Sequence, residues 1–125
     1  MKASELRIGN YVYDTLGKVN RIDLEAITYI VKEPHNQVKP IPLTEEWFFK
    51  FGFALCKKQV SLNIGNELFD YAMKNEFIIW KDSRKGWTLD GRVSRETYYI
   101  QYVHQLQNLY FALTGEELSF STVTD

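Results

Sequence analysis

The sequence predicts an α+β fold, and three observations support this prediction. Short runs of β-branched and aromatic residues, separated by turn residues, fill the N-terminal region and residues 54–102. Two other segments, after Thr44 and from Val103, have apolar residues at helical spacing. The 125 residues, 45% hydrophobic and 25% charged, suit one globular domain. We therefore expect a single domain over residues 1–125, with a β subunit at 1–38 and the helix, sheet and C-terminal helix at 39–125.

The N-terminal region has the pattern of a small antiparallel meander. Strands are expected at residues 11–13, 19–22 and 27–31, with a tight turn at residues 16–18. A meander of this kind, if curled on itself, would resemble an SH3-type barrel, but the pattern alone does not show closure.

A short aromatic helix is expected after an extended connector at residues 39–42, where Pro40 and Pro42 restrict the backbone. Thr44 has the right chemistry for its N-cap, and Gly52 for its left-handed C-terminal residue. The helix is expected to direct three aromatic residues into the core: Trp47, Phe48 and Phe51.

Residues 54–102 are expected to form three to five strands of an antiparallel sheet. Residues 60–64 alternate between apolar and polar, whereas residues 76–81 are more continuously apolar. A short helix at residues 67–74 is an alternative for that segment, and residues 97–100 are expected to be a closing strand.

The C-terminal helix is expected from Val103 to about Leu113, followed by Gly115. At 100° per residue, its apolar residues fall within an arc of about 120°, as expected for a helix packed on the sheet. These inward-facing residues are Val103, Leu106, Leu109, Tyr110 and Leu113.

Three segments of the chain resemble a family of short uncharacterised proteins from bacterial and bacteriophage genomes. The segments are LRIGN at residues 6–10, KPIPLTEEW running to FGF at residues 39–53, and YVHQLQNLYFALTGEEL at residues 102–118. The family has no assigned activity, so the resemblance implies a bacterial or phage-encoded accessory protein and brings no catalytic or cofactor-binding residue.

The other side of the C-terminal helix has an unusual composition. It presents four residues at positions i, i+3, i+4 and i+7: His104, Gln107, Asn108 and Phe111. Because residues 103–115 contain no charged side chain, this stripe is expected to be covered. Three kinds of group could cover it: residues 116–122 or the first strands of the same chain, a protein partner or second copy, or a small ligand. We favour a non-enzymatic protein-binding or self-associating module, in which Asn108→Arg leaves folding intact but abolishes association.

Nucleic-acid binding is the main alternative. It would use a sheet surface on which bases stack on aromatic rings and phosphates contact basic residues. The basic candidates for this surface are Arg84, Lys85, Arg92 and Arg95, and the aromatic ones are Trp87, Trp80, Tyr98 and Tyr99. A formal charge of −1 gives this alternative no overall electrostatic support.

The remaining features identify no catalytic centre. Cys56 is the single cysteine, and His35 and His104 lack a second ligand at metal-binding spacing, so no metal site is predicted. Glycine-rich phosphate loops are absent, so no cofactor is predicted. The polar N-terminus and single cysteine favour a cytoplasmic protein that does not enter the membrane. A small-molecule-binding protein, or an enzyme whose site the sequence does not reveal, stays a further alternative.

Overall fold

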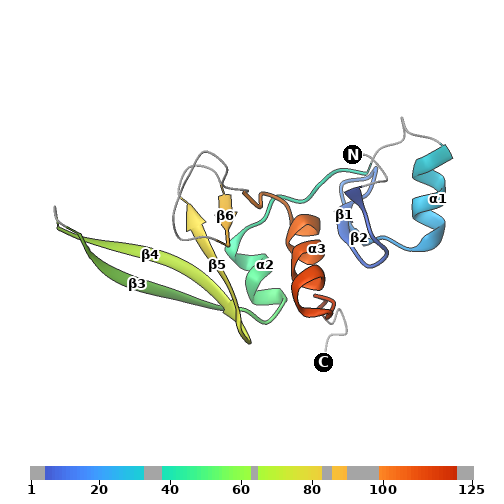
Figure 1. The fold of residues 1–125 in the computed structure, drawn as a ribbon. Coiled ribbons are helices and arrows are strands. Elements are labelled where there is room, and N and C mark those ends of the chain that lie inside the picture. The colour runs from blue at the N-terminus through green and yellow to red at the C-terminus, as the bar shows by residue number, and fades with distance from the viewer. Residues whose placement is uncertain (1–4, 33–37, 63–64, 83–85, 90–98, 121–125) are drawn as a thin grey trace, which may run out of the picture. The chain divides into compact units, whose positions relative to one another are not determined.

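The computed structural model describes residues 5–32, 38–62, 65–82, 86–89 and 99–120 (Figure 1). The fold is α+β, as predicted. The chain divides into two compact units. The first unit comprises Met1–Pro42 and Tyr102–Ser119, and the second comprises Leu43–Gln101 and Phe120–Asp125. The expected single domain, with subunits at 1–38 and 39–125, stays a prediction; the two compact units group the C-terminal helix with the N-terminal segment.

The first unit contains a two-stranded sheet in which β1 (Tyr11–Tyr13) pairs antiparallel with β2 (Val19–Arg21). The predicted turn is present, with Gly17 at a φ of 80° that favours glycine. The third predicted strand, at residues 27–31, is wrong: this segment lies in helix α1 (Leu24–Lys32). Residues 5–32 are therefore a hairpin followed by a helix, and not the expected three-stranded meander, which was the basis for an SH3-like barrel.

Local hydrogen bonding and apolar spacing explain why α1 is a helix. The Asp23 carboxylate accepts a hydrogen bond from the Ala26 N–H at 2.7 Å, which caps the first turn. Ala26, Ile27 and Ile30 then fall on one side of the helix, where they meet a buried apolar cluster. The other members of that cluster are Leu6, Val12, Ile22 and Val38. Burial of this helical stripe outweighs the β propensity of the isoleucines.

Helix α3 (Val103–Thr114) confirms the prediction of a C-terminal helix ending near Gly115, which has a φ of 76°. Gln105 accepts a hydrogen bond from the Tyr102 N–H at 3.1 Å and so caps the N-terminus of the helix. Within its unit α3 contacts β1, a partner that the predicted packing on the large sheet did not include. The predicted apolar face is buried at Val103, Leu106 and Tyr110, whereas Leu113 is 59% exposed and was assigned to the core wrongly.

The second unit contains α2 (Glu45–Lys50) and a four-stranded antiparallel sheet in the order β3-β4-β5-β6. The strands are β3 (Ala54–Leu62), β4 (Gly65–Lys74), β5 (Phe77–Asp82) and β6 (Gly86–Thr88). The alternative of a helix at residues 67–74 is therefore wrong. Ile100 forms an isolated bridge with Trp87, while residues 97 and 98 of the expected closing strand lie outside the described residues.

The aromatic helix packs as predicted. Trp47, Phe48 and Phe51 are all buried, and the Phe48 ring lies 4.3 Å from the Trp87 ring, measured between centroids. Gly52 has the expected positive φ, 85°. Thr44 occupies the N-cap with an extended backbone, but its side chain makes no capping hydrogen bond, contrary to expectation.

Candidate functional site

The polar stripe predicted on the C-terminal helix lies mostly inside the first unit. His104 is 3% exposed and Gln107 is fully buried, whereas Phe111 is 38% exposed. Asn108 is half-buried. The structure therefore brings these four residues together on α3, but it covers most of the stripe.

The Gln107 side chain joins α3 to two other backbone segments, residues 9–11 and the segment at Leu118. Its side-chain oxygen accepts a hydrogen bond from the Tyr11 N–H at 2.8 Å. Its side-chain nitrogen donates to the carbonyl oxygens of Gly9 and Leu118, each at 3.0 Å. The amide thus satisfies backbone groups just before β1, at the start of β1 and after α3, which is a structural role.

Asn108 connects the same helix to the N-terminal segment. Its oxygen accepts hydrogen bonds from Asn10 Nδ2 at 2.8 Å and from the Arg7 guanidinium at 3.1 Å. Its nitrogen donates to the Glu5 carbonyl at 3.2 Å. Arg7 also forms an ion pair with Glu117 and lies 4.0 Å from the centroid of the Phe111 ring.

These contacts select one of the three coverings considered from the sequence. The N-terminal segment and the segment after α3 cover the stripe, so the chain itself is the covering element. The hypothesis that His104, Gln107, Asn108 and Phe111 form an open contact surface does not fit their burial. Asn108→Arg was expected to leave folding intact, but that required an uncommitted Asn108 side chain, which the structure does not have. LRIGN and YVHQLQNLYFALTGEEL, two of the three segments that carry the family resemblance, form these contacts.

His104 is a buried imidazole with an unusual environment. None of the described residues forms a hydrogen bond with its Nδ1 atom, and its ring stacks on the Tyr102 ring with 6.0 Å between centroids. Burial lowers the pKa of His104 below its ordinary value, and the nearby Glu5 carboxylate only partly opposes this effect. The folded chain therefore favours the neutral imidazole.

The free energy of unfolding is expected to fall as the pH drops through about 6.5, the ordinary histidine pKa. Because the pKa of His104 is lower in the folded state, the unfolded chain takes up the proton first, and acid favours unfolding. The slope cannot exceed about 1.4 kcal/mol per pH unit, the limit for one proton. Urea denaturation at a series of pH values measures this slope.

His104→Phe should flatten this part of the pH profile of stability, while His35→Asn, which changes the only other histidine, should leave the profile unchanged. An unchanged profile in His104→Phe would contradict the assignment.

The residues of the nucleic-acid alternative are not brought together by the described structure. Arg84, Lys85, Arg92 and Arg95 lie outside the described residues. Trp87 is described, but it is 4% exposed and packs against Phe48 in the core. Trp87 was therefore assigned to an exposed stacking surface wrongly, because a strand aromatic gains more by packing against the aromatic helix.

The four-stranded sheet has a different candidate surface, on the side that faces away from α2. In an antiparallel sheet, residues directly opposite each other project from the same face. The strand register therefore groups seven residues in two rows. One row is Cys56, Tyr71, Trp80 and Thr88, and the other is Ala54, Met73 and Ile78. We call these seven residues the outer face.

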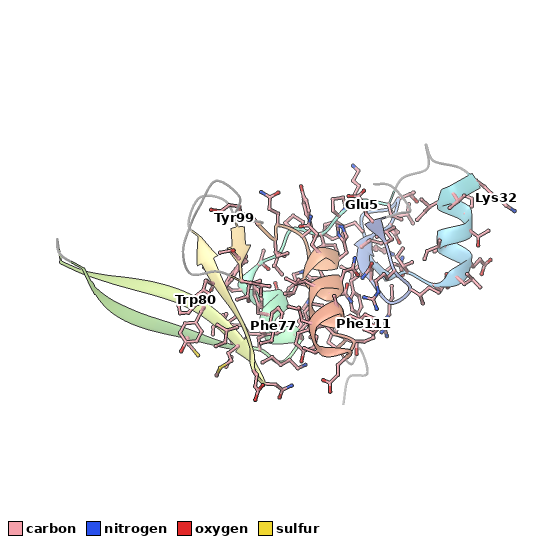
Figure 2. All side chains as sticks on the ribbon, viewed as in Figure 1. Glu5, Lys32, Phe77, Trp80, Tyr99 and Phe111 are labelled. Atoms are coloured by element: carbon pink, nitrogen blue, oxygen red, sulfur yellow. The ribbon has the colours of Figure 1, made fainter. Side chains whose placement is uncertain are left out.

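The opposite side of the sheet is covered by α2. Ala72, Ile79 and Phe77 on that side are buried, and Lys81 forms a 3.2 Å ion pair with Glu45 of the helix. Figure 2 shows Phe77 and Trp80 on opposite sides of β5, with Phe77 on the side of α2.

The outer face is apolar and substantially exposed. Met73 is 36% exposed and Ile78 is 37% exposed. Tyr71 and Trp80 are half-buried neighbours, with 4.8 Å between ring centroids. None of the seven residues is charged. The exposed side of a sheet is usually polar, whereas this one consists mainly of apolar and aromatic side chains. Thr88, at the β6 end, is the buried member of the set.

The Tyr71 hydroxyl is associated with the Cys56 thiol across the strand pair. A hydrogen bond with Cys56 is the largest cause of a raised Tyr71 pKa, so the phenol is neutral at physiological pH. The face therefore gains no charge from its one tyrosine. Cys56 is a free, half-buried thiol.

The sequence carries a signal for this surface in residues 77–80, Phe-Ile-Ile-Trp. A strand with one solvated face alternates between apolar and polar residues, whereas a continuous apolar run puts apolar side chains on both faces. The strand register then adds Tyr71 and Met73 beside them.

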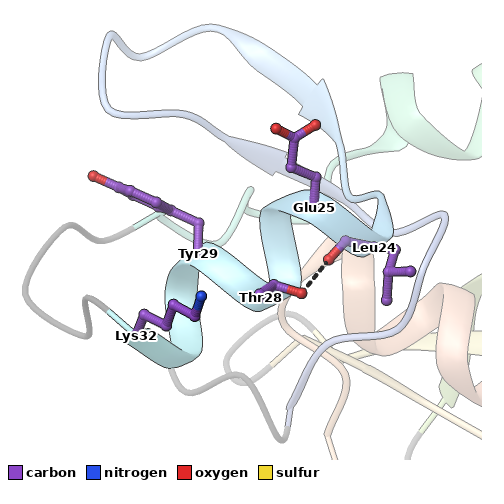
Figure 3. A pocket seen from close by; sticks show the side chains of 5 residues that line it. All are labelled: Leu24, Glu25, Thr28, Tyr29 and Lys32. Carbon is purple, nitrogen blue, oxygen red and sulfur yellow. Dashed lines mark hydrogen bonds between the residues drawn. The ribbon is translucent and has the colours of Figure 1, made fainter.

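A shallow depression of about 530 Å³ lies along α1 in the first unit. Its lining comes from one helix: Leu24, Glu25, Thr28, Tyr29 and Lys32 (Figure 3). The Thr28 hydroxyl donates to the Leu24 carbonyl within the helix at 2.9 Å. Side chains of a single helix surface do not converge on a common point, so the depression has no arrangement suited to catalysis.

Within the described part of the chain, no three His, Cys, Asp or Glu side chains gather closely enough to hold a metal ion. A helix long and apolar enough to cross a membrane is likewise not found in that part. Comparisons with protein-family models, curated proteins and solved structures find no match to this chain.

Proposed function

We propose that the chain is a non-enzymatic protein-binding module whose interface is the outer face of its four-stranded sheet. The observation that carries this proposal is the pair of uncharged apolar rows, in which Met73 and Ile78 keep more than a third of their surface exposed. Interface cores are enriched in aromatic residues and methionine and depleted in charge. The outer face has this composition, with Trp80 and Tyr71 as the expected anchors.

The protein is further proposed to act in the cytoplasm, as a phage- or mobile-element-encoded accessory factor. The single cysteine supports a reducing compartment, and the resemblance of three segments to short bacterial and phage proteins supports the source. Neither the cytoplasmic location nor the phage or mobile-element origin depends on which partner the outer face binds.

Ile78→Glu is expected to weaken partner binding about 30-fold or more, because it places an unpaired carboxylate in a surface that binding desolvates. The tagged wild type and the tagged variant are each expressed in the native host together with an untagged copy of the chain. Both are purified in parallel, and the proteins that copurify with each are quantified. Phe49→Glu is the matched control, since Phe49 is 63% exposed on α2 and lies outside the outer face.

A partner, or an untagged copy, that is lost with Ile78→Glu but kept with Phe49→Glu supports the proposed interface. Equal retention by both variants contradicts it. Recovery of nucleic acid that dissociates with increasing salt, without a protein partner, would replace it with the nucleic-acid alternative.

A further inference from the structure

Helix α1 carries apolar residues on both of its sides. One side packs in the core of the first unit. Away from that core, three large apolar residues stay exposed: Leu24 by 68%, Tyr29 by 50% and Val31 by 64%. A helix that is apolar all round is normally buried, so this second side has the composition of a covered surface. We call it the α1 surface, and Figure 3 shows five of its six residues. The six are Leu24, Glu25, Thr28, Tyr29, Val31 and Lys32.

The α1 surface has charges of opposite sign at its two ends. Glu25 lies in the first turn of the helix and Lys32 in the last turn, and both are exposed. Seven residues correspond to about 10 Å along a helix, so these two side chains are too far apart to pair with each other. None of the ion pairs among the described residues involves either one. Each end therefore presents a charge that an opposite charge on a partner can neutralise.

The positions of these residues make the α1 surface complementary to itself. When two copies of a helix pack antiparallel about a two-fold axis, a residue before the centre faces the residue equally far after it in the other copy. With the axis near Thr28, Glu25 of one copy faces Lys32 of the other, and Leu24 faces Val31. The symmetry forms each contact twice. Antiparallel packing also places the positive end of each helix dipole beside the negative end of the other.

We propose that the α1 surface binds the α1 surface of a second copy of this chain, which gives an antiparallel, two-fold symmetric dimer. The contact is isologous, so assembly ends at two copies. One side of a nine-residue helix is a small interface, and we expect a Kd in the range of about 10–100 µM. The contact lies on a helix of the first unit and does not use the outer face of the sheet. It therefore goes beyond the proposed function and can fail independently of it.

Charge reversal at either end of the α1 surface tests the proposal. Glu25→Lys alone, or Lys32→Glu alone, places like charges opposite each other twice in the dimer. Each variant should raise the dimer Kd about tenfold or more in low salt, measured by sedimentation velocity over a dilution series. An equimolar mixture of the two variants should recover about the wild-type Kd. In the mixed dimer one copy has lysine at both positions and the other has glutamate, so both contacts again join opposite charges.

Val31→Ala tests the apolar part of the contact. Alanine forms helices better than valine, so α1 is expected to stay folded. The dimer Kd should rise about tenfold, because the substitution removes apolar contact area in both copies. Glu76→Lys is the matched control for charge, since it changes the net charge as Glu25→Lys does but at an exposed site of the second unit. Its dimer Kd should equal that of wild type.

Recovery in the mixture separates the proposal from misfolding, since one misfolded chain does not repair another. The proposal is overturned if wild type stays monomeric up to about 1 mM, if either reversal dimerises like wild type, or if the mixture does not recover. Ile78→Glu should dimerise normally. Self-association that is lost in Ile78→Glu and kept in Glu25→Lys would place the contact on the outer face and overturn the α1 dimer. Normal dimers of Ile78→Glu with no loss of any partner would support the α1 dimer and contradict the proposed function.

Discussion

Phe48→Ala is expected to lower the free energy of unfolding by about 3–5 kcal/mol, the usual cost of emptying a buried phenylalanine site. Phe48 is fully buried between two other rings, with centroid distances of 5.1 Å to Phe53 and 4.3 Å to Trp87. The cavity would lie between α2 and the covered side of the sheet, where rigid aromatic neighbours limit collapse.

Urea denaturation measures this loss, and hydrogen exchange followed by mass spectrometry locates it. Protection should fall in residues 43–101, the segment of the second unit that contains α2 and the sheet. Phe49→Ala is the matched control, because Phe49 adjoins Phe48 on the same helix but is 63% exposed, and its loss should cost less than about 0.5 kcal/mol. Equal effects of the two substitutions would contradict the packing of α2.

Gln107→Leu is expected to cost about 3 kcal/mol, although leucine is similar in size and more apolar. The substitution leaves the Tyr11 N–H and the carbonyls of Gly9 and Leu118 without their side-chain partner in a buried site. A buried polar group deprived of its partner costs about 1–3 kcal/mol, and three are affected here.

The Gln107→Leu effect should appear in the first unit. Hydrogen exchange should increase at residues 9–11 and around Leu118, the segments joined by the amide. Leu16→Ala, at a side chain of the first unit that is 80% exposed, provides the control and should change stability by less than about 0.5 kcal/mol. If Gln107→Leu proved neutral or stabilising, the amide would have no structural role.

Local sequence determined the parts of the fold that depend on local chemistry. Gly52 and Gly115 have the positive φ values expected at the ends of α2 and α3, and the turn at Gly17 is where its residue type predicts. The burial of Trp47, Phe48 and Phe51 follows from their placement on one side of a short helix. These features involve residues within one or two helical turns of each other, so interactions between neighbours along the chain are enough to determine them.

The tertiary structure decided which of two local patterns applied at residues 27–31. Ile27, Thr28, Tyr29, Ile30 and Val31 all have high β propensity, yet the segment is helical. The helix buries Ala26, Ile27 and Ile30 against Leu6 and Ile22, a contact that depends on residues brought together only by folding.

The candidate surfaces were likewise set by long-range contacts. Periodicity identified the uncharged stripe on α3, but Gln107 is buried because its partners at Gly9 and Tyr11 lie far away in sequence. The outer face combines residues of four strands, and only the register places Met73 beside Ile78 and Tyr71 beside Trp80. Sequence by itself therefore determined the ends of α2 and α3, the aromatic helix and the turn at Gly17, since these depend on neighbours along the chain. Which faces are covered and which stay open was decided by the tertiary structure, because burial depends on partners that the chain brings together only when it folds.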